Sequence, residues 1–103
     1  SEINIELPEA SAEPVEERED MLELVIDAEG HYFIDEQQVV NTELETLKQA
    51  IQKFLGERSE IPVVICADRL TPYESVVRAM DATAQLGLVQ MSLATSQPES
   101  ASE

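Results

Sequence analysis

Polar and apolar residues alternate at the start of the apolar-rich part of the chain. In Met21–Ile26 every second residue is leucine or isoleucine, and this period of two predicts a strand with one buried face. Ala28–Gly30 predicts a turn in which Gly30 takes a positive φ, and His31–Ile34 predicts the return strand. A second polar turn leads to Gln38–Val40, a short third strand or an extended segment.

The spacing of apolar residues then becomes helical. Asn41 or Thr42 should cap a helix here, and Thr42 and Glu45 have the spacing of a capping box. Apolar residues follow every three or four positions, so one face of this helix should be buried, and Gly56 should end it within a turn or so. The predicted buried stripe consists of Leu44, Leu47, Ile51, Phe54 and Leu55.

Two further apolar runs enclose a second helical segment. Val63–Ile65 is a β-branched run leading to Asp68, and Val89–Thr95 alternates apolar with polar side chains. Because strands joined through a helix run parallel, these two runs should belong to one sheet. The sequence therefore predicts an α/β (α+β) two-layer domain, with two helices packed on one face of a mixed sheet of about four to five strands.

A second capping box marks the helix between these runs. Thr71 and Glu74 have the required spacing, with Pro72 at the first helical position, and Gly87 supplies the stop. The apolar side chains of this helix should face the sheet, and they include an aromatic residue expected in the core. They are Tyr73, Val76, Val77, Met80 and Ala84.

A series of short motifs in fixed order carries a family resemblance. The motifs are Ala67-Asp68 at a strand end, Pro72-Tyr73, Val76-Val77 and Met80-Asp81 in a helix, then Gly87 and a terminal strand. Together with Ile5–Ser11 and Leu24–Ile34, this series resembles the periplasmic domain of the ExbD/TolR family. Ile5–Ser11 is similar to the Leu-Pro segment after the family's single membrane span, and Leu24–Ile34 to its first hairpin. Glu74 departs from the family, in which glycine often follows the tyrosine.

The resemblance implies a non-enzymatic part of a motor driven by the proton gradient. Its partners would be a membrane subunit of the ExbB/TolQ kind and an energy transducer, TonB or TolA. The domain would lie in the periplasm, anchored in the inner membrane by a preceding helix that carries the family's proton-binding aspartate. We expect an ExbD-like role in TonB-dependent import, because the tail is short and polar. A TolR-like subunit that binds peptidoglycan is the alternative.

Composition divides the chain into three parts. Residues 9–20 are rich in glutamate and hold a single larger apolar side chain, Val15, so they cannot bury enough surface to fold alone. We therefore expect residues 1–20 to be a flexible acidic linker, residues 21–95 to be the folded domain and residues 96–103 to be a disordered tail.

The net charge of −16 disfavours two classes of partner. Nucleic acid and anionic lipid headgroups would be repelled by such a surface, so neither is expected to bind. A cationic protein partner would be attracted. The same acidity could equally reflect a saline habitat.

Few residues offer chemistry. Cys66, the only cysteine, excludes an intramolecular disulfide and is expected as a buried small side chain. His31, the only histidine, should be exposed on the hairpin, and the two residues make no metal-binding spacing. Asp68 should organise a turn by accepting backbone N–H groups rather than act as an acid or base with Asp27 or Asp81. We therefore predict no catalytic residue, no metal site and no cofactor.

The expected binding surface is the edge of the sheet. An uncovered edge strand invites pairing, so we expect a homodimer through Val89–Thr95 and capture of an extended TonB-like segment beside it. Ile3–Pro8 alternates like a latent strand, expected to pair with a sheet edge only in a complex or dimer. The candidate partner-binding residues are Ile5, Leu7, Pro8, Val89, Met91, Ser92, Leu93 and Thr95, and the turn residues are Gly30, Asp68 and Gly87.

Overall fold

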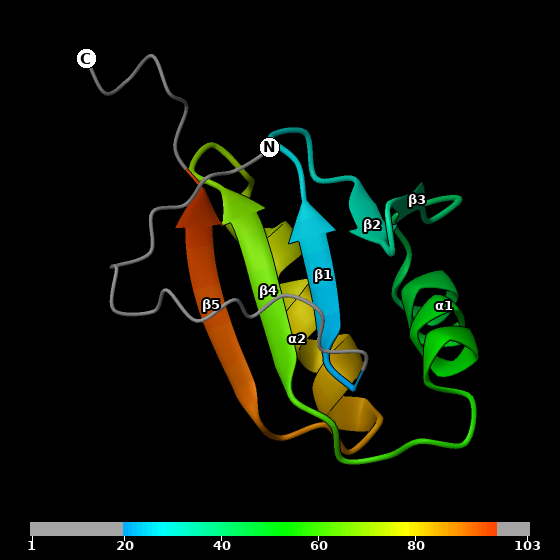
Figure 1. The fold of residues 1–103 in the computed structure, drawn as a ribbon. Coiled ribbons are helices and arrows are strands. Elements are labelled where there is room, and N and C mark those ends of the chain that lie inside the picture. The colour runs from blue at the N-terminus through cyan, green and yellow to red at the C-terminus, as the bar shows by residue number, and fades with distance from the viewer. Residues whose placement is uncertain (1–19, 97–103) are drawn as a thin grey trace.

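The computed structural model describes residues 20–96 of the chain. Almost all of the predicted linker and tail therefore lies outside the described residues. Within residues 20–96, neither helix is long and apolar enough to cross a lipid bilayer. The elements, in chain order, are β1 (Leu22–Ile26), β2 (Tyr32–Ile34), β3 (Gln37–Gln38), α1 (Leu44–Leu55), β4 (Val63–Asp68), α2 (Tyr73–Gln85) and β5 (Met91–Ser96) (Figure 1).

The five strands form one mixed sheet in the order β3-β2-β1-β4-β5. β1 is antiparallel to β2 and parallel to β4, and β4 is parallel to β5. Both helices lie on the same side of this sheet, α1 packing near β2 and α2 against β4 (Figure 1). This two-layer arrangement confirms the predicted fold class.

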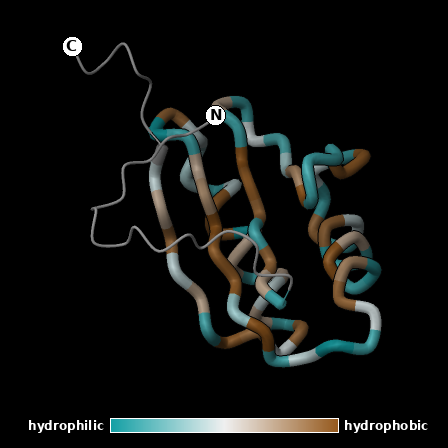
Figure 2. Tube along the Cα trace, in the orientation of Figure 1, coloured by the Kyte–Doolittle hydropathy of each residue, from teal (hydrophilic) through white to brown (hydrophobic). Residues whose placement is uncertain are grey.

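The core lies between the helices and the central strands. Residues of β1 are alternately buried and exposed, and the register places Leu22 beside Val63 and Leu24 beside Ile65 on the helix-covered face. Figure 2 shows hydrophobic residues along these two strands. Helix α1 contributes a stripe close to the predicted one, in which three residues are buried and two partly buried. The buried ones are Leu47, Ile51 and Leu55, with Leu44 and Phe54 packed beside them.

The predicted buried stripe of α2 is wrong except at Val76, which is partly buried against the core. Tyr73 is 82% exposed, and Val77 and Met80 are each more than 40% exposed. The buried face consists instead of small side chains one or two turns apart: Ser75, Ala79, Ala82 and Thr83. Small residues let the helix backbone lie close to the sheet, and the larger apolar residues are left on the neighbouring face.

Both predicted capping boxes are also wrong. Helix α2 starts after Pro72 without a side-chain cap. The Thr71 hydroxyl instead donates to the backbone carbonyls of Asp27 (2.9 Å) and Ile26 (3.3 Å). The hydroxyl thus joins the start of α2 to the end of β1, a tertiary contact that replaces the local cap.

At α1 the cap residue is Glu43, again without a side-chain cap bond. The Asn41 side chain accepts the N–H of Glu43 at 2.9 Å, so Asn41 rather than Thr42 organises this start. Gly56 follows the last helical residue as predicted, and its N–H donates to the carbonyl of Gln52 at 3.0 Å.

The third strand is shorter and earlier than predicted. It comprises only Gln37–Gln38, because the turn before it uses just Asp35 and Glu36, both with positive φ (57° and 66°). Val39 is buried just beyond the strand, and its N–H donates to the carbonyl of Tyr32 at 2.8 Å.

One buried contact ties the first hairpin to α2. Tyr32 is fully buried, and its hydroxyl donates to the backbone carbonyl of Ser75 at 2.7 Å. Gly30 has φ 90°, and a Cβ at this position would lie 2.7 Å from Ser75 Oγ. Glycine therefore satisfies both the turn geometry and the close approach of the helix.

Candidate functional site

Among the strands of residues 20–96, β5 lies at one edge of the sheet, with β4 as its only neighbour (Figure 1). It spans Met91–Ser96 and pairs in register from Val63↔Met91 to Asp68↔Ser96. The predicted strand began two residues too early, because Val89 precedes β5 and is 77% exposed. The four other candidate residues of the terminal strand, Met91, Ser92, Leu93 and Thr95, lie in β5, and Val89 lies in the connection from α2.

The register shows which main-chain groups of β5 are free to pair. The N–H of Val63 donates to the carbonyl of Gln90 at 2.8 Å, so the main-chain groups of Gln90 face β4. Main-chain groups of successive strand residues point to opposite sides, so those of Ser92 also face β4. The N–H and C=O groups of Met91, Leu93 and Thr95 therefore point away from the sheet, toward its free edge.

The strand β5 itself contains no charged residue. The sequence has no Asp, Glu, Lys or Arg between Asp81 and Glu99, although 27% of the chain is charged. Natural sheets commonly blunt their edges with lysine, proline or bulges. An uncharged, regularly paired edge strand is instead a template for another strand.

An apolar strip on α2 lies beside the same edge. The Thr83 hydroxyl contacts the Met91 sulfur at 3.2 Å, which brings α2 next to β5. Tyr73, Val77 and Met80 continue this side of the helix into solvent, and Leu93 on β5 is 57% exposed. The side chains of Met91, Leu93 and Thr95 share the helix-covered face because their partners on β4, Val63, Ile65 and Ala67, are buried there.

The opposite face of the sheet has no helix over it within residues 20–96. The register aligns Phe33, Val25, Cys66 and Ala94 in one row across four strands, and each is only partly buried or exposed. The prediction that Cys66 is a buried core residue is therefore wrong, because its side chain points to this open face. Burial and the Glu23 carboxylate, whose Oε2 lies 3.6 Å from the sulfur, raise the pKa of Cys66 to about 11. Such a thiol is a poor nucleophile at neutral pH.

Three ligand-type side chains meet in the turn between β1 and β2. One donor atom each from Asp27, Glu29 and His31 lies within 4.8 Å of the others. His31 Nδ1 is 3.1 Å from Asp27 Oδ2, and Asp27 Oδ1 accepts the backbone N–H groups of Glu29 (2.9 Å) and His31 (2.8 Å). Burial raises the pKa of Asp27, but these hydrogen bonds, led by the His31 N–H, outweigh it and hold the pKa below its usual value. These hydrogen bonds of the turn explain why the three side chains lie close together.

The remaining candidate residues are placed as follows. Asp68 Oδ1 accepts the N–H of Leu70 at 2.8 Å and so holds the turn after β4. Gly87 has φ 82°, and its N–H donates to the carbonyl of Ala84 just after α2 ends. Ile5, Leu7 and Pro8 lie outside the described residues.

Sequence reasoning missed the exposed strip Tyr73, Val77 and Met80 because it assigned these side chains to the core. The signal that could have revealed them is the i, i+4, i+7, i+8 spacing of the small residues Ser75, Ala79, Ala82 and Thr83. A stripe of small residues with this spacing can mark the buried face of a helix, just as a stripe of large apolar residues does.

Comparison with known proteins adds to this geometry. Over residues 1–98 the chain matches the family described as biopolymer transport protein ExbD/TolR. The Tol-Pal system protein TolR of Pseudomonas aeruginosa PAO1 is 30% identical over 106 residues, which cover 93% of this chain and 73% of that protein. The biopolymer transport protein ExbD of Neisseria gonorrhoeae is 27% identical over 96 residues, covering 90% of this chain and 67% of that protein. ExbD of Neisseria meningitidis serogroup A is similar to the same extent.

Proposed function

Because this chain belongs to the ExbD/TolR family, we propose that it is a non-enzymatic, partner-binding domain of an inner-membrane motor subunit. Its place would be the periplasm, anchored through a preceding membrane helix and assembled with an ExbB/TolQ-like subunit. Its task would be to engage an energy transducer that spans the envelope. The observation that carries this proposal is the uncharged, unprotected edge strand β5.

Strand addition is the mechanism that this edge supports. An extended segment of the transducer would exchange hydrogen bonds with the outward N–H and C=O groups of Met91, Leu93 and Thr95. Every second side chain of the added strand would lie on the helix-covered face, because side chains alternate along a strand. There it would pack against Leu93 and the exposed apolar side chains of α2, Val77 and Met80. We therefore expect a captured segment with alternating apolar residues.

Electrostatics adds a second requirement on the partner. The chain carries a net charge of −16, so a segment with flanking basic residues would associate faster than a neutral one. The strand β5 itself has no charged residue that would repel either a basic or an acidic segment. Main-chain pairing would then fix the register after electrostatic attraction has brought the two proteins together.

We favour an ExbD-like role in TonB-dependent import, in which the captured segment belongs to a TonB-like protein. A TolR-like role is the second candidate, since a TolR is 30% identical and the ExbD proteins are 27% identical to this chain. The two differ in transducer, TonB-like or TolA-like, and in whether peptidoglycan is bound.

The experiment compares two substitutions at Leu93. Leu93→Pro removes an N–H that faces the free edge and not β4, and proline is tolerated at such edge positions. Leu93→Ala keeps the N–H and removes most of the side chain. Isotope-labelled protein is titrated with the periplasmic part of a TonB-like or TolA-like protein, and circular dichroism checks that each variant is folded.

We expect Leu93→Pro to weaken binding by about tenfold or more, and Leu93→Ala by clearly less, because the proline ring also blocks the approaching strand. Equal losses for the two variants would exclude main-chain pairing. Shifts confined to Asp68 and His31, with none in Met91–Ser96, would indicate a cleft-type site instead. Retention on purified cell walls would favour the TolR-like role.

A further inference from the structure

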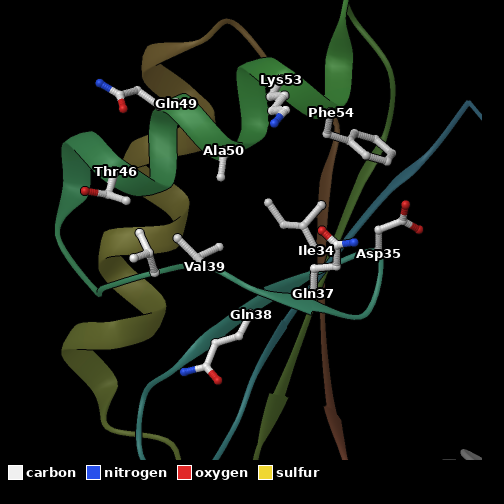
Figure 3. A pocket seen from close by; sticks show the side chains of 11 residues that line it. Ile34, Asp35, Gln37, Gln38, Val39, Thr46, Gln49, Ala50, Lys53 and Phe54 are labelled. Carbon is white, nitrogen blue, oxygen red and sulfur yellow. The ribbon is translucent and has the colours of Figure 1, made fainter.

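A pocket lies at the other edge of the sheet from β5, between the β2–β3 hairpin and α1 (Figure 3). Its volume is about 420 Å³. The floor is apolar: Ile34 and Val39 are both 7% exposed, and Ala50 and Phe54 are partly buried beside them. Polar side chains, among them Gln37, Gln49, Asp35 and Lys53, form the rim (Figure 3).

The sequence explains why this space is not filled. Helix α1 buries Leu47, Ile51 and Leu55 against the core, and the pocket lies along the next face of the helix. On that face Thr46 and Ala50 are short, one turn apart.

The charges at the rim have no partners within residues 20–96. Lys53 makes no ion pair or hydrogen bond with another described side chain, and the same is true of Asp35. Lys48, one and a half turns earlier on α1, is fully engaged: it donates to Gln85 at 2.8 Å and lies 3.6 Å from Glu45. An unpaired ammonium group at a pocket is notable in a chain of six basic and 22 acidic residues.

We propose that this pocket binds the carboxylate end of a short peptide whose last side chain is small and apolar. Lys53 holds the carboxylate, and the floor formed by Val39, Ala50 and Phe54 takes the side chain. The Gln37 amide can donate to and accept from the peptide main chain.

The size of the pocket supports this class of ligand. Pockets of 300–1,000 Å³ hold small molecules, and about 420 Å³ is large enough for a dipeptide. For an acetylated dipeptide of about 14 non-hydrogen atoms, typical ligand efficiency corresponds to a dissociation constant of about 1 mM. The site is independent of the strand-addition edge, since β3 and β5 are the two outer strands of the sheet.

The test uses acetyl-Ala-Ala with a free carboxylate, the same peptide with an amidated end, and free alanine. Each is titrated into isotope-labelled protein, and backbone shifts are followed by residue. We expect the free carboxylate peptide to move the amide signals of Val39, Ala50 and Phe54, with a dissociation constant of about 1 mM. The amidated peptide should bind at least about threefold more weakly, and free alanine more weakly still.

Matched variants separate the pocket from general charge effects. Lys53→Gln should weaken binding by up to about fivefold, the upper end of the range for an exposed ion pair. Lys48→Gln removes the same charge from the same helix outside the pocket, so it should leave the affinity unchanged. Ala50→Leu should fill the floor and abolish the shifts, and the wild-type spectrum elsewhere would show that this variant is folded.

Three results would overturn the proposal. The first is equal binding of the free and amidated peptides. The second is equal weakening by Lys53→Gln and Lys48→Gln. The third is the absence of peptide-dependent shifts around the pocket at 10 mM peptide, about tenfold above the expected dissociation constant.

Discussion

Replacing Tyr32 with phenylalanine tests the contact that joins the first hairpin to α2. The substitution removes one hydroxyl and leaves the buried ring in place. That hydroxyl donates to the Ser75 carbonyl at 2.7 Å and lies 3.5 Å from an Arg78 guanidinium nitrogen. A buried hydrogen bond of this kind contributes about 1 kcal/mol. The Ser75 carbonyl is also in the first turn of a helix, where it accepts a helical N–H, so the loss should stay near that value.

A matched control exists in the same helix. Tyr73 is 82% exposed, so Tyr73→Phe removes the same atom from the surface and should change stability by less than about 0.5 kcal/mol. Urea unfolding followed by circular dichroism measures both. For Tyr32→Phe we expect a loss of about 1 kcal/mol and a fall in Tm of about 4–8 °C, as in other domains of 60–100 residues.

Alkaline pH provides an independent test of the same contact. Burial raises the pKa of Tyr32, although Arg78 and Ser75 oppose this effect. A group whose folded pKa is raised contributes stability that is complete below its unfolded pKa, about 10, and is lost as pH rises through the folded pKa. The difference between wild type and Tyr32→Phe should therefore shrink above pH 10. The reasoning is refuted if Tyr32→Phe costs no more than Tyr73→Phe, or if the difference stays constant above pH 10.

Two further predictions concern the turn between β1 and β2. Gly30→Ala should destabilise by at least about 1 kcal/mol, from its φ of 90° and the 2.7 Å approach of Ser75 Oγ. Gly87 also has a positive φ (82°), but no atom lies within 4 Å of a Cβ added there, so Gly87→Ala should destabilise less than Gly30→Ala. Equal losses in urea unfolding would contradict the role of the Ser75 contact. Asp27→Asn should lower the Tm at pH 7 but hardly at pH 2–3, because a carboxyl with a depressed pKa loses its contribution as pH falls. A Tm difference that does not depend on pH would contradict this.

The sequence was most informative where one face of an element is buried. β1 and α1 were predicted almost residue by residue, because alternation and a helical stripe report burial directly. The order of elements and the parallel pairing of β4 with β5 followed from the crossover rule.

Prediction failed where tertiary contacts replaced local ones. Thr71 has the spacing of a cap but bonds to the end of β1, a partner 44 residues away in sequence. α2 buries small residues because the helix lies close to the sheet, and that distance is set by the whole core rather than by the helix sequence. Tyr73 was misplaced for this reason.

The candidate edge was only partly predictable. The alternation of Met91, Leu93 and Thr95 identified the strand and its apolar side. Which main-chain groups face outward depends on the register with β4, which no local pattern specifies. The pocket could not be predicted at all, since Val39 and Lys53 come together only when the hairpin packs on α1.

A sheet edge can be paired only once, and this limits what β5 can do. A second copy that paired with β5 would use the same N–H and C=O groups of Met91, Leu93 and Thr95 as a captured transducer segment. We therefore expect homodimerisation through β5 and capture to compete. The net charge of −16 on each copy opposes the dimer and attracts a cationic segment, and salt screens both effects. Rising salt should then increase the dimer fraction in sedimentation while it weakens capture. A dimer fraction that stays unchanged when the transducer segment binds would show that the two events use different surfaces. The net negative charge of the chain therefore disfavours pairing of two copies through β5 and leaves this edge available for a partner of opposite charge.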